Sequence, residues 1–372
     1  YVNRTSDNIS RLLIETVDQD LTKIKPRVEE ELKRLINAEI VSQAGNEYEF
    51  LTGERRNFER EVRIVRNQIR HQDRQKGVSQ FASQAIGFKT IEYLNKEFDI
   101  KTSFDESPVN TKGAIEIKFY SPYTASTGLG ITELEERSLR HDQTHTIYIL
   151  SDKISNFDSE LNYYLAMSEV IQAWKGDSNK TQYERTLATD RERKELEKIR
   201  QSIIGMLNKG LGNCHIIHKG QSRTIISANQ KASITIRGEV AKFWPTLYER
   251  FKKVPIKLRN EKRDILDVLV GNTRLSNEVK NLKLYDSSNQ VNVNAPLLDE
   301  LRIFLATQEI NQIRTTGKTL LEKFSNTPYG WDQGVVRVGI AVLVRNGNLL
   351  ILINRKRYEN PNDSQLKESL SN

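Results

Sequence analysis

Cysteine is almost absent from this 372-residue sequence, which contains Cys214 alone. One thiol excludes an internal disulfide and fits a reducing compartment, so we expect a cytoplasmic protein. Long apolar runs are missing too: Val335–Val344 and Leu349–Ile353 fall short of the roughly 20 residues that cross a bilayer. The start shows no charged segment followed by an apolar one, which predicts that no signal peptide is present. Because the sequence begins with Tyr1, we expect a piece of a longer protein. From the short apolar runs we expect no membrane contact.

The motifs of common active sites are also missing. The sequence contains neither a Gly-x-Ser-x-Gly elbow nor a Gly-x-Gly-x-x-Gly loop. Thr315–Thr319 ends like a phosphate-binding loop, but Gln312 stands where that loop needs its first glycine. The residues before it have a helical pattern, so we interpret Thr315 or Thr316 as a helix cap. The sequence predicts no catalytic residue and no cofactor of its own.

Two groups of residues have the spacing of metal ligands without the number that a site needs. They are His141 with His145, and Cys214 with His215 and His218. A structural zinc site takes four ligands, and no Cys-x-x-Cys pair exists to complete either group. We therefore predict no metal site.

One carboxylate pattern leaves an enzymatic alternative open. Glu116 and Lys118 alternate on a predicted strand, and Asp105 lies upstream. In metal-dependent nucleases, acids hold a cation and a lysine helps to position water for attack on phosphate. Alternating charges on a half-exposed strand produce the same pattern without any chemistry. The alternative hypothesis is a metal-dependent nuclease that uses these three residues.

The charge balance is basic, with 57 Lys and Arg against 49 Asp and Glu and a net charge of +8. This excess permits attraction to nucleic acid or to an acidic partner without requiring it. The pattern predicts an α+β, mostly helical fold, in which winged-helix modules flank a central α/β region and long charged helices. The predicted segments are a winged helix (1–52), a connector helix (53–80), an α/β region (81–177), a helical region with short strands (178–310), a second winged helix (311–357) and a polar tail that frays (358–372).

The first winged helix is predicted from two helices followed by a hairpin. Helical spacing gives two apolar faces: Ile9, Leu12, Leu13 and Val17, then Val28, Leu32, Leu35 and Ile36. Pro26 is placed near the start of the second helix, where a missing N–H costs little. A Gly45-Asn46 turn between the Ile40–Val41 and Tyr48–Phe50 segments predicts a β-wing.

Two basic groups in this part of the chain are candidate DNA contacts. On the second helix they are Lys25, Arg27, Lys33 and Arg34, with Glu29, Glu30 and Glu31 among them. From Gly53 to about Lys76 we predict a single amphipathic helix. Its apolar seam is Phe58, Val62, Val65 and Ile69, and its basic flank is Arg56, Arg60, Arg63, Arg70 and Arg74. The flank suits either the tracking of DNA phosphates or a solvated connector.

The secondary structure of the rest of the chain is predicted from shorter patterns. Strands are predicted at Phe98–Phe104, Ala114–Tyr120, Thr146–Leu150, Cys214–His218 and Thr224–Ser227. Helices are predicted at Phe157–Trp174, Ser178–Lys209, Ile236–Phe251, Glu261–Val270 and Ala295–Ile310. The second winged helix combines a helical block from Gly317, a helix at Val335–Arg345 and a strand at Leu349–Ile353. Because that helix is nearly apolar, we expect it to pack or to contact protein rather than DNA.

Several short stretches, taken together, resemble the BrxC or PglY family of BREX phage-defence systems. They are Glu47–Arg55, Phe119–Pro122, Gly317–Phe324 and Pro328–Trp331. The resemblance implies an AAA-type ATPase that acts beside an adenine methyltransferase and a phosphatase-like protein. ATP and Mg²⁺ would belong to the parent protein, because this chain carries neither Walker motif. We therefore expect a non-catalytic region that assembles with defence-complex partners and contacts double-stranded DNA through the basic groups.

Overall fold

The computed structural model describes residues 3–16, 19–38, 40–50, 52–227, 231–358 and 360–371. Contacts divide the chain into two compact units, and each unit is built from separated stretches of sequence. The first contains residues 1–86, 120–130 and 150–214, and the second contains 87–119, 131–149 and 215–372. No helix in the described part of the chain combines the length and the apolar character that spanning a bilayer takes. The fold is α+β, as the sequence predicts.

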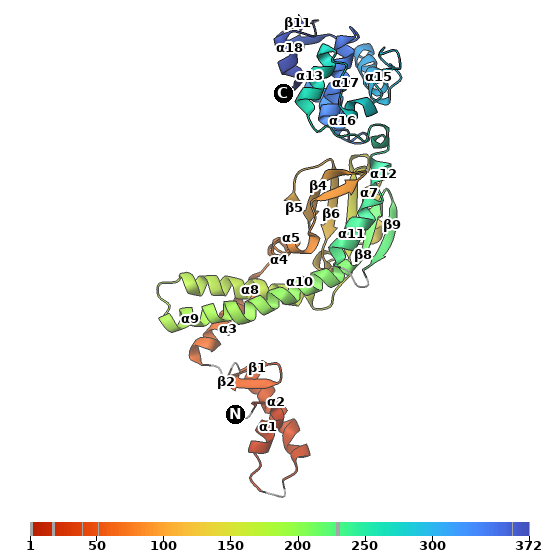
Figure 1. The fold of residues 1–372 in the computed structure, drawn as a ribbon. Helices are drawn as coiled ribbons and strands as arrows, with labels where there is room; N and C mark the ends of the chain where they lie inside the picture. Colours follow the sequence, from red (N-terminus) through yellow and green to blue (C-terminus); the bar gives the residue numbers. More distant parts are fainter. Residues whose placement is uncertain are drawn as a thin grey trace. The chain divides into compact units, whose positions relative to one another are not determined.

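The first unit begins with the predicted winged-helix outline (Figure 1). Its elements are α1 (Ser6–Leu12), α2 (Leu21–Asn37), β1 (Val41–Ala44) and β2 (Glu47–Phe50). Thr5 forms an antiparallel bridge with Glu47, which adds a third short strand to the hairpin. The prediction for Pro26 is wrong: α2 begins at Leu21, capped by Asp20, so Pro26 lies inside the helix. Val17 and Glu39 lie outside the described residues.

Helices make up the rest of the first unit. They are α3 (Gly53–Gln68), α4 (His71–Ser79), α5 (Ala82–Ile86), α6 (Pro122–Ser126), α8 (Phe157–Gly176), α9 (Gln182–Arg191), the π-helical turn η2 (Glu192–Leu196) and α10 (Glu197–Gly212). The single helix predicted from Gly53 to Lys76 is wrong. Ile69 and Arg70 are extended, and the Asp73 carboxylate accepts the Arg70 N–H, which starts α4 as a new helix.

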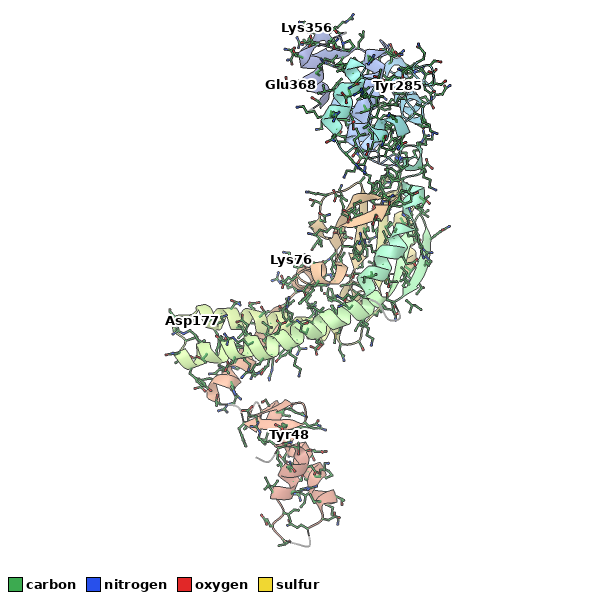
Figure 2. The ribbon with its side chains drawn as sticks, in the orientation of Figure 1. Tyr48, Lys76, Asp177, Tyr285, Lys356 and Glu368 are labelled. Atoms are coloured by element: carbon green, nitrogen blue, oxygen red, sulfur yellow. The ribbon has the colours of Figure 1, made fainter. Side chains whose placement is uncertain are left out.

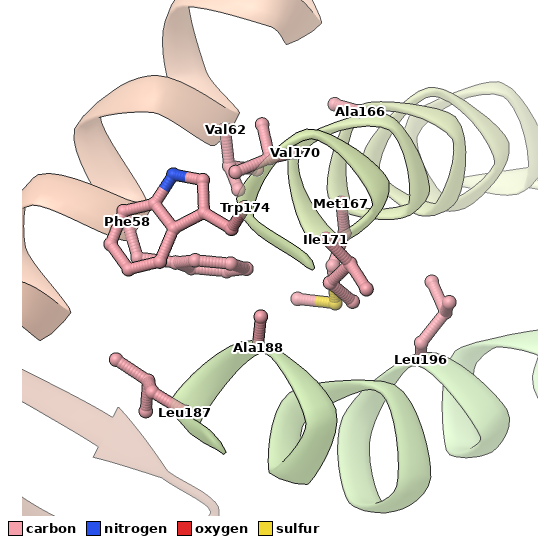
Figure 3. Close-up of a cluster of buried hydrophobic side chains, with 10 residues drawn as sticks. All are labelled: Phe58, Val62, Ala166, Met167, Val170, Ile171, Trp174, Leu187, Ala188 and Leu196. Atoms are coloured by element: carbon pink, nitrogen blue, oxygen red, sulfur yellow. The ribbon is translucent and has the colours of Figure 1, made fainter. Parts of the chain in front are cut away.

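A core of buried side chains joins α3, α8 and α9 in this unit (Figure 3). The ring of Phe58 meets that of Trp174 edge-to-face, with centroids 5.0 Å apart. The indole Nε1 of Trp174 donates to Glu61 at 2.7 Å, and the ammonium of Lys180 lies 3.9 Å from the ring centroid. The apolar seam predicted on α3 therefore packs into the core, while its polar flank stays at the surface.

The large sheet of the second unit has the order β3-β4-β6-β7-β8-β9, with β5 paired to β4. The strands are β3 (Thr90–Tyr93), β4 (Lys96–Phe104), β5 (Ser107–Asn110), β6 (Ile115–Tyr120), β7 (Thr146–Ser151), β8 (Asn213–His218) and β9 (Gln221–Ile226). β4 runs parallel to β6, and β7 is buried along its whole length. The helix α7 (Ile131–Ser138) contacts β9, the 3₁₀ turn η1 (His141–Gln143) precedes β7, and α11 (Ala232–Ala241) contacts β3.

The helix predicted around Ile236–Phe251 is wrong. α11 ends at Ala241, α12 covers only Trp244–Leu247, and the 3₁₀ turn η3 covers Phe251–Lys253. Pro245 lies in the first turn of α12. A proline cannot donate a backbone hydrogen bond, and its ring disfavours the helical conformation of the residue before it.

The C-terminal part of the second unit is helical and ends in a hairpin and a last helix. Its elements are α13 (Glu261–Val270), α14 (Asn277–Asn281), α15 (Pro296–Ile310), α16 (Gly317–Ser325), α17 (Gln333–Arg345), β10 (Ile351–Ile353), β11 (Lys356–Tyr358) and α18 (Ser364–Ser371). α17 packs against α13, α15, α16 and α18. The frayed tail predicted from Tyr358 is wrong over Ser364–Ser371, because α18 buries Leu366 and Leu370.

A buried carboxylate ties this helical part together. Glu300 on α15 is 3% exposed, and it accepts hydrogen bonds from Arg250 and Lys253 at 2.6 Å and from the Tyr329 hydroxyl at 2.9 Å. Burial alone would raise the pKa of Glu300, but the bonds from Lys253, Tyr329 and Arg250 outweigh it, so the pKa lies below its ordinary value. The Trp331 indole N–H donates to the Arg250 carbonyl at 3.2 Å.

Replacing Glu300 by Gln removes the charge that these three donors share while keeping the side-chain shape. At pH 7 we expect a loss of about 1–3 kcal/mol in the free energy of unfolding. Because the folded pKa is depressed, the stability due to ionised Glu300 is complete above the ordinary pKa of about 4.3. It is lost as pH falls through the lower folded pKa, so the difference from wild type shrinks there. Urea unfolding followed by tryptophan fluorescence measures both effects.

Glu309→Gln is the matched control, because Glu309 is exposed on the same helix. We expect its effect to stay within about 0.5 kcal/mol. Equal stability of the two variants at pH 7 would contradict the role given to Glu300.

Candidate nucleic-acid interface

The four basic residues predicted on α2 fall into two classes. Lys25 lies 3.3 Å from Asp7 of α1, and Arg34 lies 3.0 Å from Glu30 and 2.8 Å from Glu31. Arg27 and Lys33 are exposed and form no ion pair with the described residues. Of these four residues, Arg27 and Lys33 are therefore the exposed, unpaired cations.

Lys23 belongs to this surface and was missed from the sequence. Since α2 starts at Leu21, its first eight residues contain Lys23, Lys25 and Arg27 and no acid. Cations near the amino end of a helix face the positive end of its dipole, so this placement costs stability. Asp7 of α1 is paired with Lys25, and Asp20 caps the helix, with hydrogen bonds from Thr22 that lower the pKa of its carboxylate. Had the helix start been placed at Asp20 rather than at Pro26, Lys23 would have been recognised as a basic residue of this helix.

The wing of this module carries the opposite charge. Glu47 and Glu49 of β2 are paired with Arg4 at 3.8 and 3.9 Å, and Glu49 also lies 2.8 Å from Arg55. The cations here are matched by carboxylates of the hairpin itself. Within this module, the amino-terminal half of α2 is the basic surface.

The basic flank beyond the wing is divided by the break between α3 and α4. Arg56, Arg60 and Arg63 follow helical spacing on α3 and are exposed. Arg70 is exposed at the start of α4, whereas Arg74 lies 3.0 Å from Asp158 and over the ring of Tyr123. The guanidinium of Arg74 thus holds α4 to α8. Arg56, Arg60 and Arg63, three of the arginines of α3, form an exposed basic strip.

The main helix of the second winged-helix block has no free face. Every residue from Val338 to Val344 is buried in α17. Arg337 is paired with Glu261 at 2.9 Å, and Arg345 donates to the carbonyl of Val268 at 3.1 Å. Base edges are read by exposed polar side chains, which α17 offers only at its ends, at Gln333 and Arg345. The expectation that this helix packs is confirmed, and its role toward DNA stays a prediction.

The three residues of the nuclease hypothesis lie on β6 and in the turn that follows the neighbouring strand β4. Asp105 lies in the β4–β5 turn with φ 46°, is 1% exposed, and donates its N–H to the Phe119 carbonyl at 2.8 Å. Lys118 lies 3.3 Å from Glu106. Glu116 shares a face of β6 with Lys118 and is half-buried. Among the described residues, no three His, Cys, Asp or Glu side chains are grouped to hold a metal ion. The nuclease hypothesis stays a prediction.

The histidines and the cysteine make local contacts. His145 Nε2 lies 3.0 Å from the Thr327 hydroxyl, and His218 Nδ1 lies 3.0 Å from the Thr146 carbonyl. Burial lowers the pKa of both imidazoles. Burial likewise raises the pKa of the Cys214 thiol to about 12, so it stays protonated at neutral pH.

A different kind of surface lies along α15. A groove of about 850 Å³ is lined by α15, the segment after it and the turn after α17. Ile303 and Ile313 in its lining are more than half exposed, as is Leu350. Ile310, just beyond the lining on the same helix, is 81% exposed. Charges of both signs, Asp299, Arg302 and Glu309, also line the groove.

Two family models match the chain. Residues 67–236 match the model described as the BREX ATP-binding protein BrxC 4th domain with six-stranded beta sheet. Residues 250–372 match the BREX ATP-binding protein BrxC winged helix-turn-helix domain. The strand path β3-β4-β6-β7-β8-β9 has the six strands of the first description, and the helices around α17 lie inside the second. No solved structure matches the chain.

Proposed function

Since the chain belongs to the BrxC family of BREX phage-defence proteins, we propose that it is a non-catalytic region of that machine which contacts double-stranded DNA. The observation that carries this proposal is the amino-terminal half of α2, where Lys23 and Arg27 are exposed and form no ion pair with the described residues, while Lys25 is paired with Asp7. Recognition helices of helix-turn-helix modules contact DNA with their amino-terminal residues. ATP and Mg²⁺ would be held elsewhere in the parent protein.

Salt dependence is the physical signature of this contact. Cations that neutralise DNA phosphates release condensed counterions, so affinity falls steeply as salt rises. Lys23, Arg27 and Lys33 are exposed, and no ion pair with the described residues has to break first. Arg56 and Arg60 of α3 are further exposed cations of the same unit.

Replacing Lys23, Arg27 and Lys33 together by Gln tests the contact. Glutamine supports the helix about as well as lysine or arginine, so α2 should persist. We expect duplex DNA to bind about tenfold more weakly near 0.1 M salt, with a salt slope reduced by about 2 to 3. Fluorescence anisotropy of a labelled duplex over a series of salt concentrations measures both quantities.

The control variant carries Gln at Arg193, Lys198 and Lys209, which are exposed on η2 and α10 of the same unit. It changes the net charge by the same amount and should bind DNA nearly as wild type. If the two triple variants lose affinity equally, only net charge matters and the α2 contact is wrong.

The groove along α15 favours a second role in assembly. Its apolar residues cluster in one place, and exposed patches of this kind usually mark protein contacts. Because its charges are of both signs, the groove suits an amphipathic helix of a partner protein better than an anionic nucleic acid. Membership of the BREX system points to the methyltransferase and the phosphatase-like protein as the partners to test.

Replacing Ile303 and Ile310 by Asp should disrupt that docking without unfolding the domain, because both side chains are exposed. We expect a stability change within about 1 kcal/mol for the pair and loss of co-purification with one of the two named partners. Ile234→Asp, on the exposed face of α11, is the control and should keep the complex. Unchanged co-purification of the double variant would refute the assembly surface.

A further inference from the structure

The hairpin β10–β11 presents three consecutive cations at its tip. Arg355, Lys356 and Arg357 are all exposed, and none forms an ion pair with the described residues. Asn354 and Arg355 form the two-residue turn with φ of 51° and 65°. Such turns favour Asn followed by Gly, so an arginine at the second position costs roughly 1 kcal/mol of backbone strain. A guanidinium stands at the apex despite that cost.

The pairing of the hairpin distributes these cations over both of its faces. Arg357 lies opposite the exposed Leu352, and Lys356 lies opposite Ile353. Successive residues of a strand point to opposite faces, so Lys356 and Arg357 lie on different sides while Arg355 occupies the tip. The tip therefore has one cation on each side and one at its end, and the face of Lys356 is also that of the buried Tyr358. Figure 2 shows Lys356 at the edge of the C-terminal helical part.

The stem of the hairpin is anchored, which keeps the tip extended into solvent. Tyr358 is buried, and its hydroxyl donates to Gln365 of α18. The Lys356 ammonium lies 5.6 Å from the centroid of that ring. Asp363 at the start of α18 accepts the backbone N–H of Gln365 at 2.8 Å, so this nearby carboxylate caps the helix. The other acid of this segment, Glu368 of α18, is exposed (Figure 2).

We propose that this wing is a second DNA contact, with Arg355 at the tip entering the minor groove of a duplex and Lys356 and Arg357 contacting the phosphates beside it. The minor groove, about 6 Å wide, is too narrow for the ribbon itself, but it admits a single side chain from the tip, and a phosphate backbone borders it on each side. An arginine at the tip suits the negative potential of that groove. A flat acidic protein surface would meet only one face of the ribbon. The proposal extends the DNA contact proposed for α2 to another surface, and each can fail without the other.

The decisive variant replaces Arg355, Lys356 and Arg357 by Gln in the full chain. Duplex binding should weaken about tenfold near 0.1 M salt, with a salt slope lower by about 2 to 3. Netropsin, a small molecule that fills the minor groove of A·T-rich DNA, should compete with wild type. It should have little further effect on the wing variant. Anisotropy with an A·T-rich duplex of about three helical turns reports all of these quantities.

The matched control replaces Lys280, Arg314 and Lys318 by Gln, three exposed cations of the same helical part outside the wing. It should bind DNA and respond to netropsin as wild type does. Equal losses in the two variants would overturn the proposal, as would a wing variant that still competes with netropsin in full. Preferential binding of poly-glutamate, lost in the wing variant, would assign the wing to an acidic protein and also overturn it.

The α2 variant keeps this test separate from the first proposal. If α2 substitutions have no effect while wing substitutions weaken binding, the wing stands and the α2 contact fails. The reverse result removes the wing and keeps α2. When both contacts exist, a chain with all six substitutions binds more weakly than either triple variant.

Discussion

The carboxylate of Glu300 is the point on which the C-terminal helical part depends. Its two oxygens receive bonds from Arg250, Lys253 and Tyr329, which come from the segment before α13 and from the turn before α17. A buried charge is tolerated only when its bonds are satisfied, and here the two cations keep nearly half of their side chains in solvent. The interaction therefore joins three segments, and of the charged groups only the carboxylate is fully removed from water.

That junction determines where α17 begins and what surrounds it. Trp331 stacks on Phe324 with centroids 5.2 Å apart, and Asp332 caps the first turn of α17. Beside the tryptophan, Gly330 has φ 65°, and a Cβ there would come within 2.7 Å of Phe98 and Tyr248. A helix that is apolar on all sides must be enclosed by neighbours. α17 is accordingly the core of the second winged-helix block.

Local patterns predicted much of this fold, while contacts between distant residues explain what they missed. Val335–Arg345 was placed within two residues of α17 because its apolar run is long and continuous. β3 and β5 were missed because they are short and their turns lack the usual glycine. Among the site residues, Arg27 and Lys33 could be named from the sequence as cations. That Lys25 is matched by Asp7 could not, since the pair spans two helices.

The two winged-helix blocks have a similar order of elements, but their exposed, unpaired cations lie on different elements. In the first block α2 is basic and the carboxylates of the wing are paired with Arg4 and Arg55, whereas in the second α17 is buried and the wing is basic. We therefore propose the DNA contacts from unpaired charge and not from the fold alone. Each surface offers about three phosphate contacts, which is too few for tight binding near physiological salt. Two such contacts on one duplex would multiply rather than add, because the second binds at the high local concentration set by the first. If both proposed contacts exist, the chain binds DNA tightly only when both surfaces contact the same duplex.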